Sequence, residues 1–486
     1  TPQWFISMES HELRIKALKA IDETTFYPSK GKERLRSMIE TRPDWCVSRQ
    51  RVWGVPLPIF INKKNGKVLV DDEVFENIAK IYEKEGSDCW FLDDVQKLLG
   101  NKYNAEDFEK LSDIVEVWFD SGSTHSFVLE KRKDLKWPAS MYLEGSDQHR
   151  GWFHSSLLES CGTRGRAPFE SILSHGFVVD GKGLKMSKSL GNVIAPEDIL
   201  KKYGADILRI WVASSNYAED LRIDYSILDQ HSESYRKIRN TFRYLLGNLN
   251  DNFEDINLKD LDLKKLPELE QFMLHKIYNL NINFKKYFEN YDFHNLYKEL
   301  LNFCTVDLSA FYFDIRKDTL YCDSKKTDKR KSCIILLNII LNILTKWFAP
   351  ILSFTTEEIY QLVNKKNKSI HLERFLDLPK NFENENLNKK WVELIDIRNK
   401  CNISIEEKRA KKEIGSSLEA ELNIDLSNKL KDLTEKIDFA ELCITSKATI
   451  NYKETDEVSI ITKKASGKKC PVCWKINVEP CSRHSS

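Results

Sequence analysis

The sequence has almost no excess of charge of either sign. Its 486 residues include 75 Lys and Arg against 74 Asp and Glu, which leaves a net charge of +1. A strongly basic protein attracts nucleic acid over its whole surface, so this balance excludes that class. Any nucleic-acid surface on this chain must therefore be a local patch.

The sequence also lacks a long uninterrupted apolar run. The longest run, Cys333 to Leu344, is interrupted by Asn338 and Asn342 and is closed by Lys346. It is shorter than a membrane span, so we predict a buried helix and no membrane protein. No signal-peptide pattern opens the sequence, and we expect a cytoplasmic protein. The chain starts at Thr1 without a helix cap or strand lead-in, which suggests part of a longer protein.

Cysteines are scattered along the chain, as in a reducing compartment, except near the end. Cys470-x2-Cys473-x7-Cys481-x2-His484 offers three thiolates and an imidazole at short spacing. This pattern is typical of tetrahedral zinc, and we predict one structural Zn²⁺ per chain. Free thiols are the alternative. The spacing leaves open whether His484 or another group fills the fourth position.

The predicted secondary structure of the sequence changes near residue 225. Before it, β-like runs such as Val52 to Ile61 and Ser171 to Val179 alternate with helical segments, which predicts an α/β domain. After it, helical periodicity dominates, as in Tyr235 to Leu249. Thr355 and Glu358 have the spacing of a capping box, which predicts a helix start. In the helix predicted from Tyr235 to Leu249, we expect one face to be buried, which consists of Ile238, Phe242, Leu245 and Leu249.

A short lysine-rich loop carries the main chemical signal. The stretch GLKMSKSLGN, Gly183 to Asn192, places two lysines and two serines between two glycines. Ammonium groups on such a loop can close over a polyphosphate and neutralise the charge that develops during displacement. A solvated surface turn is the alternative interpretation. The pentapeptide KMSKS, Lys185 to Ser189, is too specific for that alternative to be favoured.

This pentapeptide resembles the signature loop of class I aminoacyl-tRNA synthetases, and neighbouring segments narrow the family. RPDWCVSRQRVWGVPLP (Arg42 to Pro58), DIVEVWFDSG (Asp113 to Gly122) and YLEGSDQHRGWF (Tyr142 to Phe153) resemble the bacterial isoleucyl-tRNA synthetases. YGADILRIWVAS (Tyr203 to Ser214) and WFAPILSFTTEEIY (Trp347 to Tyr360) continue the match. The resemblance covers nearly the whole chain.

The resemblance implies an ATP-dependent ligase that activates isoleucine as the adenylate and transfers it to isoleucine tRNA. Neither step needs a protein nucleophile, so positioning and charge must supply the catalysis. In this family Lys185 and Lys188 would hold the phosphates, with Met186 and Ser187 in the same ATP-binding loop. The residues expected around the adenylate are Glu144, Gly145, Asp147 and Gln148, and the side-chain pocket is expected from Trp118 and Trp152.

The resemblance also implies a domain order. Residues 1–225 would be the second half of a Rossmann-like catalytic domain, and 226–390 an all-α bundle that binds the anticodon. Residues 391–465 would form a C-terminal junction and 466–486 a zinc module. No His-x-Gly-His motif occurs, so the half that carries the HIGH motif and the editing domain are expected to lie outside this chain. The chain taken alone could then be inactive.

Two other interpretations remain at this point. The chain could be a relative of valyl-tRNA synthetase, although the residues after SRQ and around WFDSG differ from the sequence typical of that family. It could also be a non-catalytic tRNA-binding protein, although such a protein has no need for Lys185, Lys188 and Glu144. The expected partners are ATP with Mg²⁺, isoleucine and isoleucine tRNA, and we expect a monomer.

Overall fold

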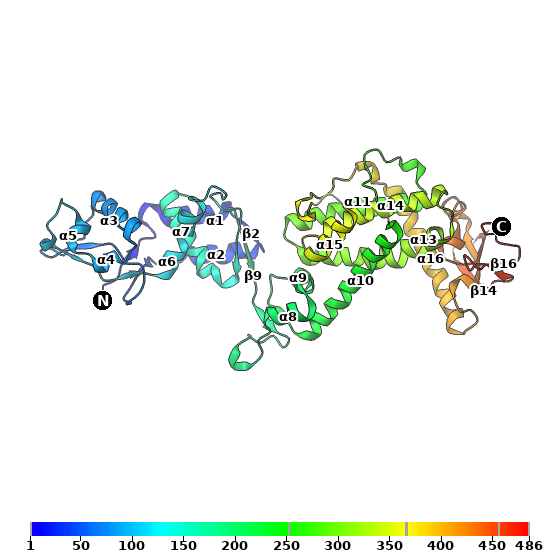
Figure 1. Ribbon diagram of the computed structural model, residues 1–486, viewed down its shortest axis with the longest axis horizontal. Coiled ribbons are helices and arrows are strands. Elements are labelled where there is room, and N and C mark those ends of the chain that lie inside the picture. The colour runs from blue at the N-terminus through cyan, green and yellow to red at the C-terminus, as the bar shows by residue number, and fades with distance from the viewer. Residues whose placement is uncertain (1, 251–252, 365–367, 455–456, 485–486) are drawn as a thin grey trace. The chain divides into compact units, whose positions relative to one another are not determined.

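The chain folds into two compact units in the computed structural model, which describes residues 2–250, 253–364, 368–454 and 457–484. The first unit comprises Thr1–Val179 and Tyr217–Leu221, and the second comprises Asp180–Asn216 and Arg222–Ser486. Strands β10 (Val178–Asp180) and β11 (Leu221–Ile223) lie where the chain passes from one unit to the other. Figure 1 labels the helices and strands of both units.

A small parallel sheet forms the centre of the first unit. Its order is β2 (Thr25–Tyr27), β9 (Ser171–His175) and β8 (Tyr142–Gly145). Helices α1 (Leu13–Glu23), α2 (Lys30–Glu40) and α7 (Trp152–Arg164) pack around it, as Figure 1 shows. Helix α7 connects the neighbouring parallel strands β8 and β9, which gives the βαβ arrangement expected of an α/β domain. The core between these layers includes Ala17, Ile21, Leu35, Phe153, Leu157 and Ile172.

A second, smaller core lies within residues 60–110 of the same unit. Phe60, Ile78, Trp90 and Leu98 are buried together there. The core is covered by α3 (Asp72–Glu85), α4 (Cys89–Leu92), α5 (Val95–Leu99) and the hairpin of β5 (Phe60–Asn62) with β6 (Phe108–Lys110). The remaining elements of the unit are β1 (Phe5–Ile6) with β3 (Trp45–Cys46), β4 (Ser48–Arg49) with β7 (Ile114–Val115), and α6 (Val117–Gly122).

The prediction of a strand from Val52 to Ile61 is wrong over most of its length. Only Phe60 and Ile61 belong to a strand, β5, and residues 52–59 form an irregular segment with one isolated bridge between Pro56 and Ile114. Pro56 and Pro58 lack the N–H groups that a ladder requires, which explains the interruption. The run Ser171 to Val179, by contrast, does form β9 and most of β10.

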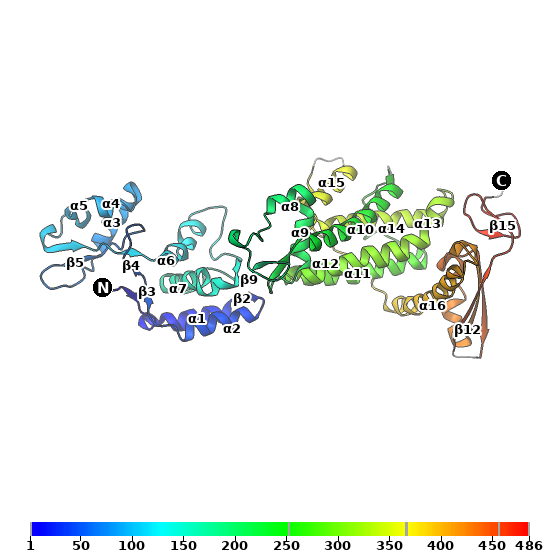
Figure 2. The ribbon, with the colours of Figure 1, turned by 90° about the horizontal axis from the view of Figure 1, so that it is seen from below.

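Helices dominate the second unit. After α8 (Pro196–Tyr203) and α9 (Ala205–Ser214), α10 (Tyr225–Leu249), α11 (Glu268–Glu289) and α14 (Asp328–Phe348) form the body, and they run side by side in Figures 1 and 2. They are joined by α12 (Phe293–Asn302), a π-helical stretch at Phe303–Tyr312, α13 (Phe313–Cys322) and α15 (Ser353–Val363). The long helices after residue 225 agree with the predicted change from mixed to helical secondary structure.

The predicted buried faces in this unit are confirmed. Ile238, Phe242, Leu245 and Leu249 are all buried on one side of α10. The run Cys333 to Leu344 lies within α14. Among the described residues, only α14 has the length and composition of a membrane span, and most of it is buried against other helices. It is a core helix, as the two asparagines in the run indicated.

The predicted capping box at Thr355 and Glu358 is wrong. Helix α15 begins at Ser353, so Thr355 lies inside its first turn. The carboxylate of Asp206, on α9, accepts hydrogen bonds from the Thr355 backbone N–H at 2.8 Å and from its hydroxyl at 2.6 Å. A carboxylate from another helix therefore satisfies the donors that the local motif was expected to satisfy.

The C-terminal part of the second unit begins with α16 (Glu385–Ala410), which runs unbroken through residue 390. A three-stranded sheet follows, in the order β13 (Lys447–Lys453), β12 (Ala420–Ser427) and β14 (Ser459–Lys464). Alternate residues of β12, Ala420, Leu422, Ile424 and Leu426, are buried. Helix α16 packs beside this sheet (Figure 2). Short helices α17 (Lys431–Thr434) and α18 (Phe439–Leu442) and the hairpin of β15 (Lys468–Lys469) with β16 (Ile476–Asn477) complete the chain.

Candidate functional site

The carboxyl end of β8 positions the acidic residues of the YLEGSDQHRGWF segment. Glu144 and Gly145 are the last residues of this parallel strand, and Asp147 and Gln148 follow in a short 3₁₀ turn. In open α/β sheets the crevice at the carboxyl ends of the strands is where ligands bind. Glu144 and Asp147 are exposed, so their carboxylates are accessible to a ligand. A Cβ atom at Gly145 would lie 2.7 Å from Oδ1 of Asp147, so a larger residue there would displace the Asp147 carboxylate.

Of the two predicted pocket tryptophans, Trp118 lies beside Gly151 and Trp152 follows it in the sequence. The indole N–H of Trp152 donates to the backbone oxygen of Ser121, 2.9 Å away, and its ring stacks on Tyr142 with a centroid distance of 4.0 Å. A Cβ atom at Gly151 would lie 2.4 Å from Oε1 of Gln148 and 3.0 Å from the Trp118 ring. Trp118, Gln148 and Trp152 are therefore brought together.

A cavity of about 310 Å³ opens beside Trp118 and Gly151. Its lining includes the guanidinium groups of Arg42, Arg49 and Arg150 and the imidazole of His154. Burial, with the charges of Arg42 and Arg150, lowers the pKa of His154 to about 3, so this imidazole is neutral. Asp44 and Glu116 also line the cavity, and the Glu116 carboxylate lies 2.9 Å from the Arg49 guanidinium, so the charges of the lining are mixed. Together with the ring of Trp118, they make this part of the first unit suited to a polar, partly apolar ligand.

The lysine-rich loop of the second unit is held by two side chains at its base. The Asp180 carboxylate accepts from the Leu184 backbone N–H at 2.8 Å and from the Asn192 amide at 2.9 Å. The amide oxygen of Asn192 accepts from the Ser187 N–H at 2.9 Å. The Asn192 hydrogen bond, ahead of the two backbone N–H donors, lowers the pKa of Asp180, which keeps this carboxylate charged. Asn192 thus ties both ends of the loop together.

The flanking glycines supply the backbone geometry of the loop. Gly183 has φ 83° and Gly191 has φ 64°, values that L side chains rarely adopt. Between them Lys185 and Lys188 are exposed, and neither forms an ion pair within the described residues. Met186 and Ser187 are half-buried, and Ser187 accepts from the Leu190 N–H. The two ammonium groups are therefore available for a ligand. The loop and the β8 segment belong to different units.

The predicted metal ligands gather in one cluster at the C-terminal end. One ligand atom from each of Cys470, Cys473, Cys481 and His484 lies within 4.8 Å of all the others. The sulfurs of Cys473 and Cys481 are 3.8 Å apart, and Nδ1 of His484 is 3.5 Å from the Cys470 sulfur and 3.3 Å from the Cys481 sulfur. A tetrahedral site with zinc–sulfur distances of about 2.3 Å has edges of about 3.8 Å, so the donor set fits zinc.

The sequence interpretation missed the residues that support these groups. Asn192 is the last residue of the GLKMSKSLGN segment, but no role was predicted for it. Asp180 lies outside that segment. Tyr142 and Gly151 stand inside the YLEGSDQHRGWF segment, but only the folded geometry shows that they orient Trp152 and Trp118. A residue with an amide side chain directly after a turn glycine was the available signal for Asn192.

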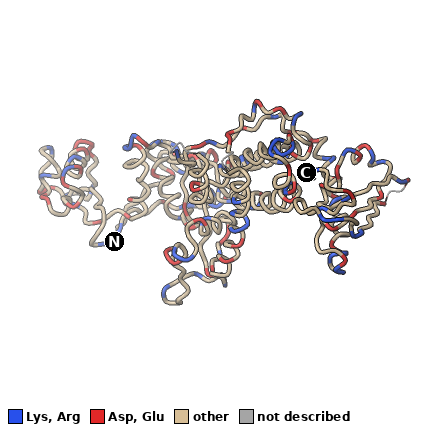
Figure 3. The backbone as a smooth tube through the Cα atoms, turned by 45° about the vertical axis from the view of Figure 1, so that its right-hand side comes forward, with Lys and Arg blue, Asp and Glu red and all other residues tan. Residues whose placement is uncertain are grey.

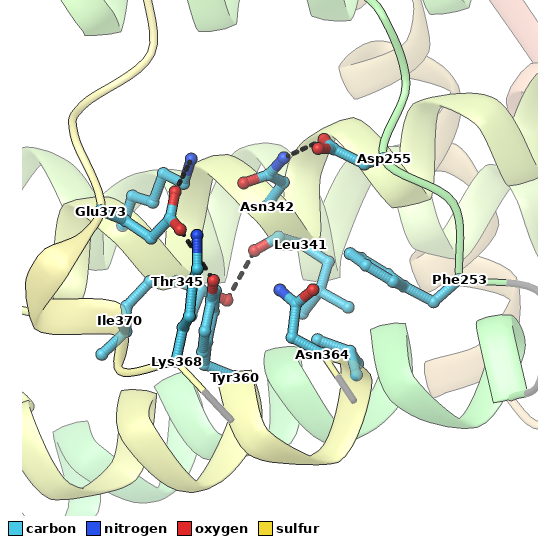
Figure 4. Close-up of a pocket in the computed structure, with 12 residues that line it drawn as sticks. Phe253, Asp255, Leu341, Asn342, Thr345, Tyr360, Asn364, Lys368, Ile370 and Glu373 are labelled. Atoms are coloured by element: carbon cyan, nitrogen blue, oxygen red, sulfur yellow. Dashed lines mark hydrogen bonds and ion pairs between the residues drawn. The ribbon is translucent and has the colours of Figure 1, made fainter. Parts of the chain in front are cut away.

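A cavity of about 130 Å³ also lies in the helical part of the second unit, between α14, α15 and residues near Phe253 (Figure 4). Its polar groups are largely paired with one another. Glu373 accepts from the Tyr360 hydroxyl at 2.8 Å and from Lys346 at 3.3 Å, and Asn342 donates to Asp255 at 2.9 Å. No catalytic constellation is assembled there, and we assign it no chemical role.

Comparison with known proteins gives consistent results for both units. Residues 1–224 match the family model of the class I tRNA synthetases (I, L, M and V). Residues 270–424 match the anticodon-binding domain of tRNA ligase. A solved structure of agnB2 LeuRS from Agrobacterium radiobacter K84, in a ternary complex with tRNA and LeuAMS, aligns with a TM-score of 0.52 and 15% identity. That alignment covers 79% of this chain and 44% of the LeuRS chain, and it shows a shared fold.

Curated relatives are much more similar in sequence. The isoleucine–tRNA ligase of Pelagibacter ubique (strain HTCC1062) is 75% identical over 485 residues, which cover 100% of this chain and 54% of the relative. The isoleucine–tRNA ligase of Brucella abortus biovar 1 (strain 9-941) is 46% identical over 496 residues, which cover 99% of this chain and 50% of the relative. The chain spans about half the length of the curated relatives it matches.

Proposed function

Because the chain belongs to the class I tRNA synthetase family, we propose that the protein carrying it is an isoleucine–tRNA ligase. It would activate isoleucine with ATP and transfer the acyl group to isoleucine tRNA during protein synthesis. The observation that carries this proposal is the loop from Lys185 to Ser189, with two unpaired lysines on a base held by Asp180 and Asn192. The isoleucine–tRNA ligases among the relatives favour isoleucine over valine, and the intact loop favours an enzyme over a pure tRNA binder.

Activation proceeds by attack of the isoleucine carboxylate on the α-phosphate of ATP, with pyrophosphate as the leaving group. Negative charge develops on the phosphate oxygens, and Lys185 and Lys188 are the groups of this chain that would neutralise it. Their exposure and lack of carboxylate partners support this role. Mg²⁺ enters with ATP and is held through the phosphates, so we assign no residue of this chain to it.

The β8 segment would bind the amino-acid end of the adenylate. Glu144 and Asp147 supply carboxylates for the substrate ammonium group, and Gln148 and Gly145 shape the turn that presents them. Trp118 and Trp152 would line the pocket for the isoleucine side chain. The Trp118 ring lies beside Gly151, and the Trp152 ring is held nearby by Tyr142 and by the Ser121 carbonyl. An apolar pocket discriminates weakly against one missing methylene group, which limits how well this site alone can reject valine.

The second unit would bind tRNA and one structural zinc ion. The helical domain, proposed at residues 226–390, has exposed Arg236, Lys237, Arg239 and Arg243 on α10, which suit phosphate contacts. We propose residues 391–465 as the junction and 466–486 as the zinc module, with Cys470, Cys473, Cys481 and His484 as ligands. The metal would hold together a segment too small for a core of its own. We infer a cytoplasmic monomer.

The test uses the whole protein that carries this chain. Lys188→Ala should lower isoleucine-dependent exchange of pyrophosphate into ATP by roughly 100-fold or more, because one transition-state charge contact is lost. Isoleucine binding should stay nearly the same. Lys182→Ala is the matched control, since Lys182 is an exposed lysine just before the loop, and it should leave the exchange rate unchanged. An unchanged rate in Lys188→Ala, or exchange that depends on valine rather than isoleucine, would contradict the proposal.

A further inference from the structure

The Cys/His cluster at the end of the chain lies against the carboxyl end of helix α13, about 150 residues earlier in the sequence. We name residues 468–484 the knuckle. Nε2 of His484 lies 3.0 Å from the backbone oxygen of Cys322, the last residue of α13. The Cys322 thiol donates to the backbone oxygen of Val472 at 3.7 Å. The end of α13, the turn between β15 and β16, and the turn of Cys481 to His484 thus meet at one place.

Arg483 adds a pair of charged contacts at the same place. Its guanidinium nitrogens lie 2.7 Å from Oδ2 of Asp318 and 2.8 Å from Oδ1 of Asp323. Asp318 lies in the last turn of α13 and Asp323 is its C-cap. The side chains of the three residues are between 13% and 34% exposed, so these ion pairs are shielded from water more than ordinary surface pairs are.

The physical reason for this docking is the chemistry of a helix end. The last carbonyl groups of an α-helix lack intrahelical donors, and this end carries a partial negative charge. The imidazole N–H of His484 supplies a donor for the Cys322 carbonyl, and Arg483 supplies a positive charge beside the same end. The knuckle therefore satisfies groups of α13 that would otherwise need water or another cap.

The same hydrogen bond fixes the tautomer of His484. A backbone carbonyl only accepts, so Nε2 must carry the proton. The lone pair of the neutral ring is then on Nδ1, the atom that lies 3.5 Å and 3.3 Å from the sulfurs of Cys470 and Cys481. Metal-binding histidines generally donate their other ring N–H to a carbonyl or carboxylate in this way, and the partner raises the affinity for the metal.

We propose that the carboxyl end of α13 is the outer shell of the metal site, so that metal binding and docking of the knuckle on the helical domain are coupled. This inference rests on the zinc site of the proposed function. Asp318 and Asp323 act as positioning residues: they hold Arg483, which holds His484 and Cys481 in place for the metal. A coupling of this kind is reciprocal, so the metal also orders the end of α13.

The first experiment measures zinc affinity by competition with a chromophoric chelator, in the whole protein that carries this chain. The double variant Asp318→Asn and Asp323→Asn keeps the size of both side chains and removes both charges. It should bind zinc roughly 10- to 100-fold more weakly, as loss of an outer-shell partner does. The matched control is Asp328→Asn, because Asp328 is exposed and pairs only with Lys331 among the described residues. The control should keep the affinity of the parent.

The outcomes separate the two claims. If the parent holds no zinc, both the metal site and the coupling are wrong. If the parent holds one zinc ion and the double variant binds it with equal affinity, the metal site stands and the coupling is overturned. An equal loss in the Asp328→Asn control would also overturn it, because the effect would then reflect charge in general.

The second experiment measures how removal of the metal affects the end of α13. It does not depend on the aspartate variants. Amide hydrogen exchange is compared between the zinc-loaded parent, the parent after chelation, and Cys473→Ser. Chelation and Cys473→Ser should both speed exchange in residues 468–484 and at residues 319–323, including the Asp323 N–H that donates to Thr319. Exchange in the middle of α14 should not change. Faster exchange confined to the knuckle, with residues 319–323 unchanged, would overturn the coupling.

Discussion

Glu159 on α7 is a carboxyl group held in surroundings that disfavour its charge. It is half-buried near Gly122 and Ser155, and its Oε1 atom is buried without a hydrogen-bond partner among the described residues. Burial, reinforced by the nearby Asp120, raises the pKa of Glu159 to about 9. At neutral pH the group is therefore protonated in the folded protein.

This shift makes the stability of the first unit depend on pH. An unfolded Glu titrates near 4.5, so between about pH 4.5 and 9 the folded state holds a proton that the unfolded state has lost. Stability should therefore fall as pH rises through this window. Glu159→Gln should remove part of that fall, so its thermal midpoint should exceed that of the parent at pH 8 and match it near pH 4.5. Melting curves at both pH values measure this.

Glu170→Gln is the control for this prediction, because Glu170 is an exposed carboxylate of the same unit paired with Lys136. It should leave the pH dependence of the melting curve as it is in the parent. If Glu159→Gln and the parent lose stability in parallel between pH 4.5 and pH 8, Glu159 is charged in the folded protein and the assignment is wrong.

The role of a single residue could be predicted from the sequence where the residue types and spacing of a motif indicate what it binds. Lys185, Lys188 and the Cys470 to His484 pattern carry charge or ligand atoms at characteristic spacing, so the residue types alone indicate what they can bind. The supporting residues were not predictable in the same way. Asn192 acts through hydrogen bonds to Asp180 and from Ser187, and Gly151 acts through a close approach to Trp118. Both effects depend on where the folded chain places the partner.

At the scale of elements, a buried charge network joins three helices of the second unit. Arg316 of α13 and Glu270 of α11 are almost completely buried, and two guanidinium nitrogens lie 2.7 Å and 2.6 Å from the two oxygens of Glu270. A third nitrogen lies 2.7 Å from Oε1 of Glu441 on α18. Burial raises the pKa of Tyr312 well above its ordinary value, so its hydroxyl stays protonated and donates to Glu270.

Removing the arginine should leave the buried Glu270 without its counter-charge, whereas Glu441 keeps its ion pair with Lys329. Arg316→Met should destabilise the second unit by about 3–5 kcal/mol, the usual cost of breaking a buried ion pair on one side. Arg316→Lys keeps the charge and loses the forked geometry, so we expect a smaller loss. Denaturant unfolding followed by helical circular dichroism measures both.

The surface pair of Lys285 and Asp377 gives the matched control, since both side chains are well exposed. Lys285→Ala should cost less than about 1 kcal/mol. If Arg316→Met proves as stable as Lys285→Ala, the network does not connect α11, α13 and α18 energetically.

Among elements, the long helices were predictable and their junctions were not. The spacing of Ile238, Phe242, Leu245 and Leu249 fixes one apolar face of α10, and a helix with such a face must bury it. The start of α15 depends instead on Asp206, which lies about 150 residues earlier in the chain and replaces the cap that Thr355 and Glu358 suggested. Local sequence cannot report a hydrogen bond to so distant a partner.

At the scale of the whole molecule, positive and negative side chains are interspersed along the chain (Figure 3). With a net charge of +1, the chain has no general attraction for RNA, so the tRNA binding that we propose would come from particular contacts. Residues 236–249 of α10 contain Arg236, Lys237, Arg239 and Arg243 and no acidic residue. Arg239 and Arg243 are exposed and have no ion-pair partner among the described residues, so they are available for phosphates.

The number of phosphates that the chain contacts should therefore appear in the salt dependence of tRNA binding. Each contact releases counterions, so contact with only two phosphates already weakens binding roughly tenfold when salt rises from about 50 to 200 mM. We expect the 486-residue chain to bind isoleucine tRNA with an affinity that falls at least this much. The double variant Arg239→Ala and Arg243→Ala should bind more weakly at low salt and show a shallower salt dependence. Fluorescence titration at several salt concentrations measures both. If the affinity for tRNA does not depend on salt, or if the salt dependence is the same in the variant and the parent, α10 does not contact the RNA backbone.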